Sequence, residues 1–373
     1  MNKTTGRFLL LLIIIITLTG CGKNIKNEMW QEIDGSSIIN FLDDSSVHFL
    51  SEKEYINNIG KYSSNALYIE GSIFSFETDG NVLTLDTNDG QKIKFKKLSR
   101  ENIGSGIIGE WTGQEDNYLF LKNGIGFYFD NETNILLKQA RYFAYSDNKI
   151  FDTAIGEYQY SSDTGSVRIS INDSEKEYIK KSNQEKMDVT GFWKWKNDDD
   201  HYYFFSSNGL VIENYLGFGT LYPAPYYNGN IYSIFGKQSY DIKDNELLVH
   251  LNFDVLLFKE NVIVDLIEVP NTSITGKWRN NPDLGFDEIE FFKDGIVIFK
   301  NTKSKICLDY IYNNGKIYET FNIREGKVVY HYNLDNDVIA LKKVSDSLDL
   351  LSGKVTQTVE DKEYKFTKSA TSP

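Results

Sequence analysis

Residues 104–109 contain the most specific chemical motif in the sequence. Gly104-Ser105-Gly106-Ile107-Ile108-Gly109 has the glycine spacing of a dinucleotide-binding loop. Such a loop binds pyrophosphate only where a strand runs into a helix, because the amino end of the helix meets the phosphates. The residues that follow read as another strand, so we interpret these glycines as a flexible linker.

Other residues capable of catalysis or metal binding are scattered. The four histidines lack metal-ligand spacing, and we interpret them as ordinary strand residues: His48, His201, His250 and His331. The run from Asn197 to Asp200 offers the oxygen ligands that calcium prefers, but without an EF-hand pattern we interpret it as a solvated turn. A hydrolase with paired carboxylates stays open, because such pairs meet in space and not along the chain. The sequence predicts no enzyme, no cofactor and no metal site.

The amino terminus has the features of a processing signal. Lys3 and Arg7 precede an apolar run from Phe8 to Leu18. This run is much shorter than the roughly 20 apolar residues of a helix that crosses a bilayer. Its end, Leu18-Thr19-Gly20-Cys21, resembles the lipobox of bacterial lipoproteins.

This resemblance implies that signal peptidase recognises Leu18, Thr19 and Gly20 and that Cys21 is lipidated. Two or three acyl chains would anchor the protein firmly, since each buried methylene contributes about 0.8 kcal/mol. The alternative is a plain secretory signal that leaves a free thiol. The lipidated protein is expected at the cell membrane or the outer membrane, facing the periplasm or the cell exterior. In this family an aspartate after the cysteine favours retention at the inner membrane, and Gly22 leaves an outer-membrane or cell-surface destination open.

Composition points to an acidic, β-rich body. The whole chain has a formal net charge of −13, and removal of the basic leader makes the remainder more acidic, which disfavours nucleic-acid partners. The 24 Tyr and 24 Phe suit half-buried pleated surfaces. Lipidation of Cys21 would leave Cys307 alone, and we expect a buried structural thiol within a strand.

The mature chain is built from four related units. Gly109-Glu110-Trp111, Gly191-Phe192-Trp193 and Gly276-Lys277-Trp278 each lead into an aromatic strand that ends in Asn-Gly or Asp-Gly. A degenerate first copy begins at Trp30 and lacks the glycine. The expected divisions are a signal peptide (1–20), a lipidated tether (21–28), four β repeats (29–100, 101–183, 184–270 and 271–345) and a carboxy-terminal tail (346–373), in which Tyr364-Lys365-Phe366 could add a strand.

Apolar residues recur at every second position within a unit, and turn residues separate the runs. This pattern predicts six or seven short antiparallel strands per unit. The fold class is therefore all-β, with tandem small antiparallel meanders that close into barrels to protect their edges. The Gly-x-Trp strand, the aromatic strand and the Tyr-rich hairpins resemble the small lipocalin-like domains of bacterial lipoproteins. A ring of propeller blades is the alternative architecture.

One aromatic segment departs from the repeat. Residues 216–227 crowd aromatic and proline residues, and we favour a lid over a barrel end, with an exposed contact surface as the alternative. The candidate binding residues in this segment are Phe218, Leu221, Tyr222, Tyr226 and Tyr227.

Two functions are consistent with these patterns. The sequence favours a non-enzymatic envelope lipoprotein whose repeats bind an unknown envelope or extracellular macromolecule or serve a structural role. The alternative, which the lipocalin resemblance implies, is a carrier or sensor of a small apolar ligand.

Overall fold

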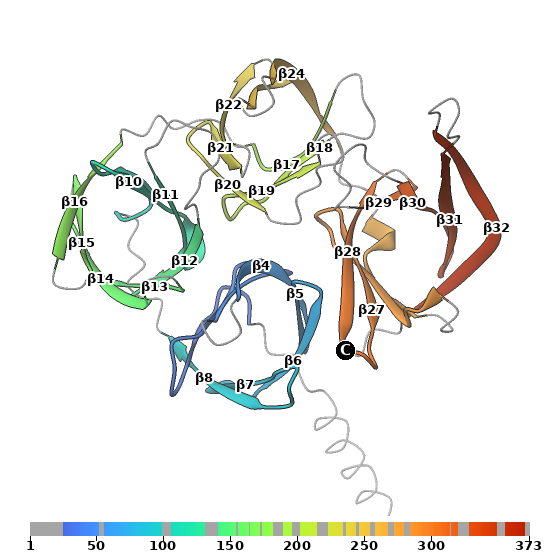
Figure 1. Cartoon of the computed structure of the whole chain (residues 1–373), viewed down its shortest axis with the longest axis horizontal. Helices are drawn as coiled ribbons and strands as arrows, with labels where there is room; N and C mark the ends of the chain where they lie inside the picture. The colour runs from blue at the N-terminus through green and yellow to red at the C-terminus, as the bar shows by residue number, and fades with distance from the viewer. Residues whose placement is uncertain are drawn as a thin grey trace, which may run out of the picture.

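The structure is a computed structural model of the 373-residue chain. It describes residues 25–369, except for residues 52–55, 99–105, 131–140, 154–155, 164, 172–173, 182–188, 196–201, 215–222, 234–235, 244–245, 254–257, 268–271, 280–283, 314, 320–327 and 349–354. The described part is all-β, as predicted, and its strands form four closed antiparallel barrels (Figure 1).

Each barrel is an up-and-down meander of eight strands, one or two more than the sequence pattern indicated. Barrel 1 consists of β1 (Met29–Glu32), β2 (Ile38–Phe41), β3 (Ser46–Ser51), β4 (Ile56–Ser63), β5 (Ala66–Ile69), β6 (Ser72–Thr78), β7 (Val82–Asp86) and β8 (Lys92–Leu98). Barrel 2 consists of β9 (Gly109–Thr112), β10 (Asp116–Phe120), β11 (Ile125–Asp130), β12 (Arg141–Ser146), β13 (Lys149–Asp152), β14 (Gly156–Ser162), β15 (Ser166–Ile171) and β16 (Ser174–Lys180). A short 3-10 turn, η1 (Lys122–Gly124), joins β10 to β11.

Barrels 3 and 4 repeat the same order. Barrel 3 consists of β17 (Gly191–Trp195), β18 (Tyr202–Phe205), β19 (Leu210–Asn214), β20 (Ala224–Tyr227), β21 (Asn230–Ser233), β22 (Gly236–Lys243), β23 (Glu246–Phe253) and β24 (Phe258–Ile267). The 3-10 turn η3 (Thr272–Ile274) precedes barrel 4, which consists of β25 (Gly276–Arg279), β26 (Glu288–Phe291), β27 (Ile296–Asn301), β28 (Ile306–Asn313), β29 (Lys316–Glu319), β30 (Val328–Asp335), β31 (Val338–Leu348) and β32 (Val355–Lys368).

Closure of every barrel pairs its first strand with its last. In barrel 1, β1 pairs with β8, and in barrel 4, β25 pairs with β32. The fourth barrel thus takes its last strand from the segment that the sequence pattern assigned to the tail, where one added strand was foreseen. Because each unit closes on itself, the structure corresponds to separate closed barrels and not to propeller blades.

Aromatic side chains fill the barrel interiors. Each barrel has its own buried cluster around a tryptophan from the first strand, namely Trp30, Trp111, Trp193 and Trp278. In barrel 2, Tyr118 packs edge-on against Tyr128 and Tyr178, at ring-centroid distances of 5.2 and 5.0 Å. Such pairs contribute roughly 0.5–1.5 kcal/mol beyond the burial of their area.

The Gly-x-Trp motif places a carbonyl oxygen over each indole. Gly109, Gly191 and Gly276 have φ values of 140°, 129° and 113°, which glycine adopts readily and other residues do not. After this bend, Trp111 Nε1 donates to Ile107 O at 2.7 Å, and Trp193 and Trp278 make the same bond to the residue four positions earlier. The glycine therefore allows a buried indole N–H to be satisfied.

Barrel 1 lacks this device. Glu28 stands where the other units have glycine, and among the described residues the buried Trp30 Nε1 has no hydrogen-bond partner. An unsatisfied buried donor costs about 1–3 kcal/mol. The first unit is thus degenerate in structure as well as in sequence.

Replacing Gly276 by alanine tests the role of the glycine bend. We expect Gly276→Ala to destabilise barrel 4 by about 1–3 kcal/mol, because its φ of 113° strains any residue with a Cβ. Gly106→Ala is the matched control, since an added Cβ meets nothing within 4 Å at either position and Gly106 has no positive φ. Urea unfolding followed by tryptophan fluorescence measures both variants, and equal midpoints would contradict the role given to the bend.

Candidate functional site at the junction of the four barrels

The described residues contain no group of three or more His, Cys, Asp or Glu side chains placed to hold a metal ion. His48, His250 and His331 lie in separate strands, β3, β23 and β30, as expected, and His201 lies outside the described residues. Cys307 is fully buried in β28, and burial raises the pKa of its thiol, so it is the structural cysteine that the sequence predicted. Gly109 begins strand β9, so no helix follows the glycine-rich motif.

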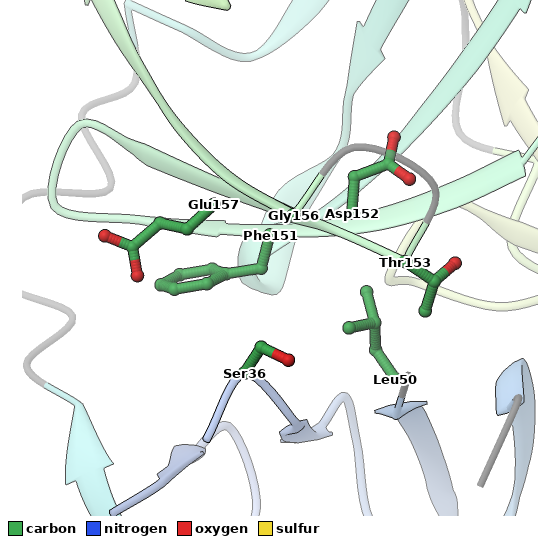
Figure 2. A pocket seen from close by; sticks show the side chains of 7 residues that line it. All are labelled: Ser36, Leu50, Phe151, Asp152, Thr153, Gly156 and Glu157. Atoms are coloured by element: carbon green, nitrogen blue, oxygen red, sulfur yellow. The ribbon is translucent and has the colours of Figure 1, made fainter. Parts of the chain in front are cut away.

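A small hollow lies between barrels 1 and 2. Ser36 and Leu50 of barrel 1 face Phe151 and Thr153 of barrel 2 across it (Figure 2). Its volume of about 10 Å³ matches a single water molecule. The hollow is therefore a packing defect between barrels and offers no room for a substrate.

The main convergence of polar groups in the described part is where the second hairpin turn of each barrel meets the others. We call this region the central junction, formed by residues 42–46, 121–125, 206–210 and 292–296. In each turn the backbone N–H of the first residue donates to the carbonyl oxygen of the fifth, with N···O distances of 2.8 to 2.9 Å. Figure 1 shows the barrels arranged around this common centre.

In each barrel a tyrosine of the fourth strand donates a hydrogen bond to a backbone carbonyl of this turn. Tyr62 donates to Asp43 O at 2.6 Å, and Tyr312 donates to Phe292 O at 2.7 Å. Tyr145 and Tyr226 donate to Leu121 O and Ser206 O. The acceptor is the first residue of the turn in barrels 2, 3 and 4 and the second residue in barrel 1. Burial, the largest cause in each case, raises the pKa of Tyr62 and Tyr312, so both hydroxyls stay protonated as donors.

The turns of barrels 2, 3 and 4 all reach barrel 1. Asn123 Nδ2 donates to Leu42 O at 2.8 Å, and Asn40 Nδ2 returns a bond to Asn123 O at 3.0 Å. Asn208 Nδ2 donates to Asp43 Oδ2 at 2.8 Å. In barrel 4 the corresponding residue is Asp294, which forms a buried ion pair with Lys61. The Asn-Gly and Asp-Gly turns in the repeat thus bind the units together as well as joining strands.

Apolar outer faces of the barrels surround these polar contacts. One cluster joins barrels 1, 2 and 3, and its buried members are Leu42, Ile59, Leu119, Leu121, Ile125, Phe127, Phe129, Leu210 and Tyr232. A second joins barrels 1, 3 and 4, with buried members Ala66, Tyr68, Ile73, Ile212, Phe292, Ile296, Ile298 and Cys307. Four such barrels cannot separate without exposing these faces, so the described body is one assembly.

Barrels 1 and 4 are also joined by backbone. Residue Ile306 of β28 pairs with Ser72 of β6, and Cys307 N donates to Gly71 O at 2.9 Å. Beside this seam, Lys300 is almost fully buried and contacts Glu288 Oε1 at 2.9 Å, Tyr68 Oη at 2.7 Å and the Glu290 carboxylate. Burial opposes the lysine charge, but Tyr68, Glu290 and Glu288 hold the pKa of Lys300 above its ordinary value.

Barrels 1 and 2 enclose a buried histidine. His48 Nε2 lies 2.9 Å from Asn57 Oδ1, and Asn57 Nδ2 donates to Tyr142 O of barrel 2 at 2.8 Å. Burial lowers the pKa of His48 to about 4, although the bond to Asn57 opposes this shift. The imidazole is therefore neutral at physiological pH and acts as a hydrogen-bonding spacer between barrels.

Barrels 2 and 3 meet through Glu110. Tyr232 Oη donates to Glu110 Oε2 at 2.8 Å, and Lys181 Nζ lies 3.1 Å from Glu110 Oε1. Burial raises the pKa of Tyr232 well above its ordinary value, and the charge of Glu110 adds to this effect. The hydroxyl thus remains a donor to the carboxylate between the two barrels.

The structure describes only some of the residues that the sequence singled out. Tyr226 and Tyr227 lie half-buried in strand β20, where Tyr226 packs into barrel 3 and Tyr227 packs against the cluster of barrels 1, 2 and 3. Phe218, Leu221 and Tyr222 lie outside the described residues, as do the run 197–200 and the lipobox residues Leu18, Thr19, Gly20 and Cys21. No helix in the described part is both long and apolar enough to cross a membrane.

Comparison with known proteins gives no family. No family model matches the chain, and no curated protein matches it. Among solved structures, the chain is similar to Hsv2 from Kluyveromyces lactis, with 10% identity, coverage of 87% of this chain and 94% of that chain, and a TM-score of 0.21. It is also similar to apo AztD from Citrobacter koseri, with 9% identity, coverage of 92% and 99%, and a TM-score of 0.14. These TM-scores are too low to carry an argument about fold or function.

Removing one tying hydroxyl tests the central junction. We expect Tyr145→Phe to lower stability by about 1–3 kcal/mol, because the carbonyl of Leu121 loses a buried donor. Tyr364→Phe is the control, since Tyr364 is half-buried in β32 and lies outside all four turns. Denaturant unfolding would show a shifted midpoint for Tyr145→Phe alone, and equal shifts would contradict the tie.

Acid should weaken the seam between barrels 1 and 2 through His48. The folded chain keeps His48 neutral down to about pH 4, whereas the unfolded chain protonates it near pH 6.5, so the unfolded state binds more protons in this window. We expect the stability advantage of the wild type over His48→Gln to fall by about 3 kcal/mol as the pH drops from 6.5 to 4. Unfolding free energies of both proteins across this range measure it, with His331→Gln at an exposed site as the control.

Proposed function

We propose that the protein is a lipid-anchored cell-envelope lipoprotein that performs no catalysis and presents its four joined barrels to a macromolecular partner. The observation that carries this proposal is that the barrel interiors and the facing outer walls are already packed. Aromatic clusters fill the interiors, and the outer faces at the central junction pack against neighbouring barrels. The remaining outward surfaces are what the body offers to another molecule.

The filled interiors support surface binding over the alternative of a small-ligand carrier. A lipocalin-type carrier needs an interior wider than its side chains fill. In barrel 2, Arg141 lies across the ring of Tyr128, with its guanidinium carbon 4.1 Å from the ring centroid, and donates to Asp152 at 2.7 Å. Charged and aromatic side chains thus occupy one end of a barrel already packed with tyrosines.

The fixed arrangement of the barrels at the central junction suits binding of a partner over an extended surface. A partner that contacts two or more barrels at once gains affinity when those barrels are held at fixed positions, because less conformational entropy is lost on binding. The acidic charge of the chain favours partners with basic or neutral surfaces and disfavours nucleic acid. A tether from Cys21 would hold this body at a membrane in the periplasm or at the cell exterior.

Replacing Cys21 tests the anchor. In a bacterial host supplied with labelled palmitate, we expect the wild type to incorporate label and to partition into detergent, and Cys21→Ser to do neither. The matched control is Cys307→Ser, which should keep the label because Cys307 is buried. Unlabelled wild-type protein in the aqueous phase would contradict the anchor and leave the plain secretory signal.

Native mass spectrometry tests surface binding against the carrier alternative. We expect the Cys21→Ser protein, purified gently from its host, to carry no small molecule, because the barrel interiors are filled with side chains. A stoichiometric apolar small molecule that leaves on collisional activation would contradict this proposal and favour the carrier.

A further inference from the structure

Lys61 and Asp294 are unusual within the repeat. Lys61 precedes the tying tyrosine of barrel 1, where the other barrels have Ala144, Pro225 and Ile311. Asp294 is the third residue of its turn, where barrels 2 and 3 have the neutral Asn123 and Asn208 and barrel 1 has Asp44, whose side chain is exposed. Both departures occur at one contact, the seam between the first and last barrels. The pair is therefore a feature of this seam and not of the repeated unit.

The Lys61–Asp294 ion pair is buried and lies beside an aromatic ring. The side chains of Lys61 and Asp294 are 6% and 8% exposed, and Lys61 Nζ lies 5.8 Å from the centre of the Phe292 ring. Lys61 Nζ also donates to the hydroxyl of Ser46, at 3.1 Å. Two opposite charges buried together lose much of their hydration, and their attraction repays this only in part. A reaction that removes both charges would relieve that cost.

We propose that Lys61 and Asp294 are joined by an amide bond between the lysine Nζ and the aspartate Cγ, which links barrel 1 covalently to barrel 4. The bond would be a modification made by the folded chain itself. The direct contact of the two groups supplies the proximity that such a condensation needs, since well-oriented groups react with effective concentrations far above those of free reagents.

The reaction balances without any co-reactant. The new bond forms between Nζ and Cγ, and one C–O bond of the Asp294 carboxyl group breaks. Two of the three ammonium protons of Lys61 leave with that oxygen as water, and the third remains on the amide nitrogen. Nothing is oxidised or reduced, and the net charge of the chain is unchanged because one positive and one negative charge disappear together.

Asp309 is placed to move these protons. It lies on β28 opposite Ile298, on the outer face of barrel 4 that packs against barrel 1. Burial raises the pKa of Asp309 to about 6, while the nearby charge of Lys61 opposes the shift. A carboxyl group that titrates close to neutral pH can accept a proton from the ammonium group and return it to the leaving oxygen.

Lys300 provides an internal comparison. It is equally buried at the same seam, but Glu288, Glu290 and Tyr68 surround its ammonium group. These partners hold the pKa of Lys300 above its ordinary value and keep the amine protonated, and a protonated amine is not a nucleophile. Two carboxylates and the Tyr68 hydroxyl thus stabilise the ammonium form of Lys300, whereas Lys61 pairs with one carboxylate and has Asp309 nearby to accept a proton. We therefore expect the modification at Lys61 and not at Lys300.

A covalent seam would matter to an exported protein of this composition. The chain has two cysteines, and the lipid would occupy one, so a disulfide is not available to close the assembly. The proposed bond closes a loop of 233 residues, which restricts the unfolded chain more than a short loop would. It does not depend on the anchor or on the partner, so failure of the proposed function would leave it standing.

Mass spectrometry tests the bond directly. The Cys21→Ser chain, which has no lipid, is denatured and weighed whole and then digested with trypsin. We expect a mass one water below that of the sequence, no cleavage after Lys61, and a branched peptide that joins Lys61 to Asp294. Cleavage after Lys300 should proceed normally. A mass equal to that of the sequence, with cleavage after Lys61, would overturn the proposal, and this result does not depend on any variant at the seam folding.

Three variants separate the steps. Lys61→Arg keeps the positive charge but should show the full sequence mass, because the guanidinium group does not condense. Asp294→Asn should lose one ammonia in place of one water, since the leaving atom is then nitrogen. Asp309→Asn should retain the full mass or reach the lower mass slowly, whereas unchanged rates in this variant would remove Asp309 from the reaction.

Discussion

The hydrogen bond from a fourth-strand tyrosine to a carbonyl of the second hairpin turn is the interaction on which this assembly depends. It fixes the shape of the turn in all four barrels, from Tyr62 in the first to Tyr312 in the last. A turn held in this way can be buried, because its backbone groups are satisfied within its own barrel. Its amide or carboxylate side chain is then available to reach a neighbouring barrel.

Barrel 1 is the hub of these contacts and deviates most from the repeat. Its central turn receives Asn123 from barrel 2 and Asn208 from barrel 3, and its fourth strand supplies Lys61 to barrel 4. Strand β3 is buried along its whole length, since one face lines the barrel and the other meets neighbouring units.

Much of the fold could be predicted from the sequence because period-two alternation depends on one buried face. Residues such as Ile93 and Phe95 alternate with lysines in β8, and this strand was correctly expected. The strand count was too low because short segments such as Asn230–Ser233 give too few residues to show a period. The central junction could not be predicted, since it depends on how closed barrels pack on one another. One signal was present: Leu119, Phe127 and Phe129 are apolar on the faces that alternation leaves outside, which indicates strands buried on both sides.

Buried charge at the seam between barrels 1 and 4 decides how this assembly closes. Apolar contacts such as those of Ile298 and Phe292 are tolerant of small shifts, whereas Lys61 of barrel 1 needs Asp294 of barrel 4 at a fixed position. Tyr68 of barrel 1 likewise contacts Lys300 of barrel 4. Because a buried ammonium group without its partners costs several kcal/mol, alternative dockings of barrel 4 are strongly disfavoured. The single backbone pairing between β6 and β28 is too short to set this alignment alone. The charges therefore specify where the last barrel docks, and the apolar faces supply most of the energy that keeps it there.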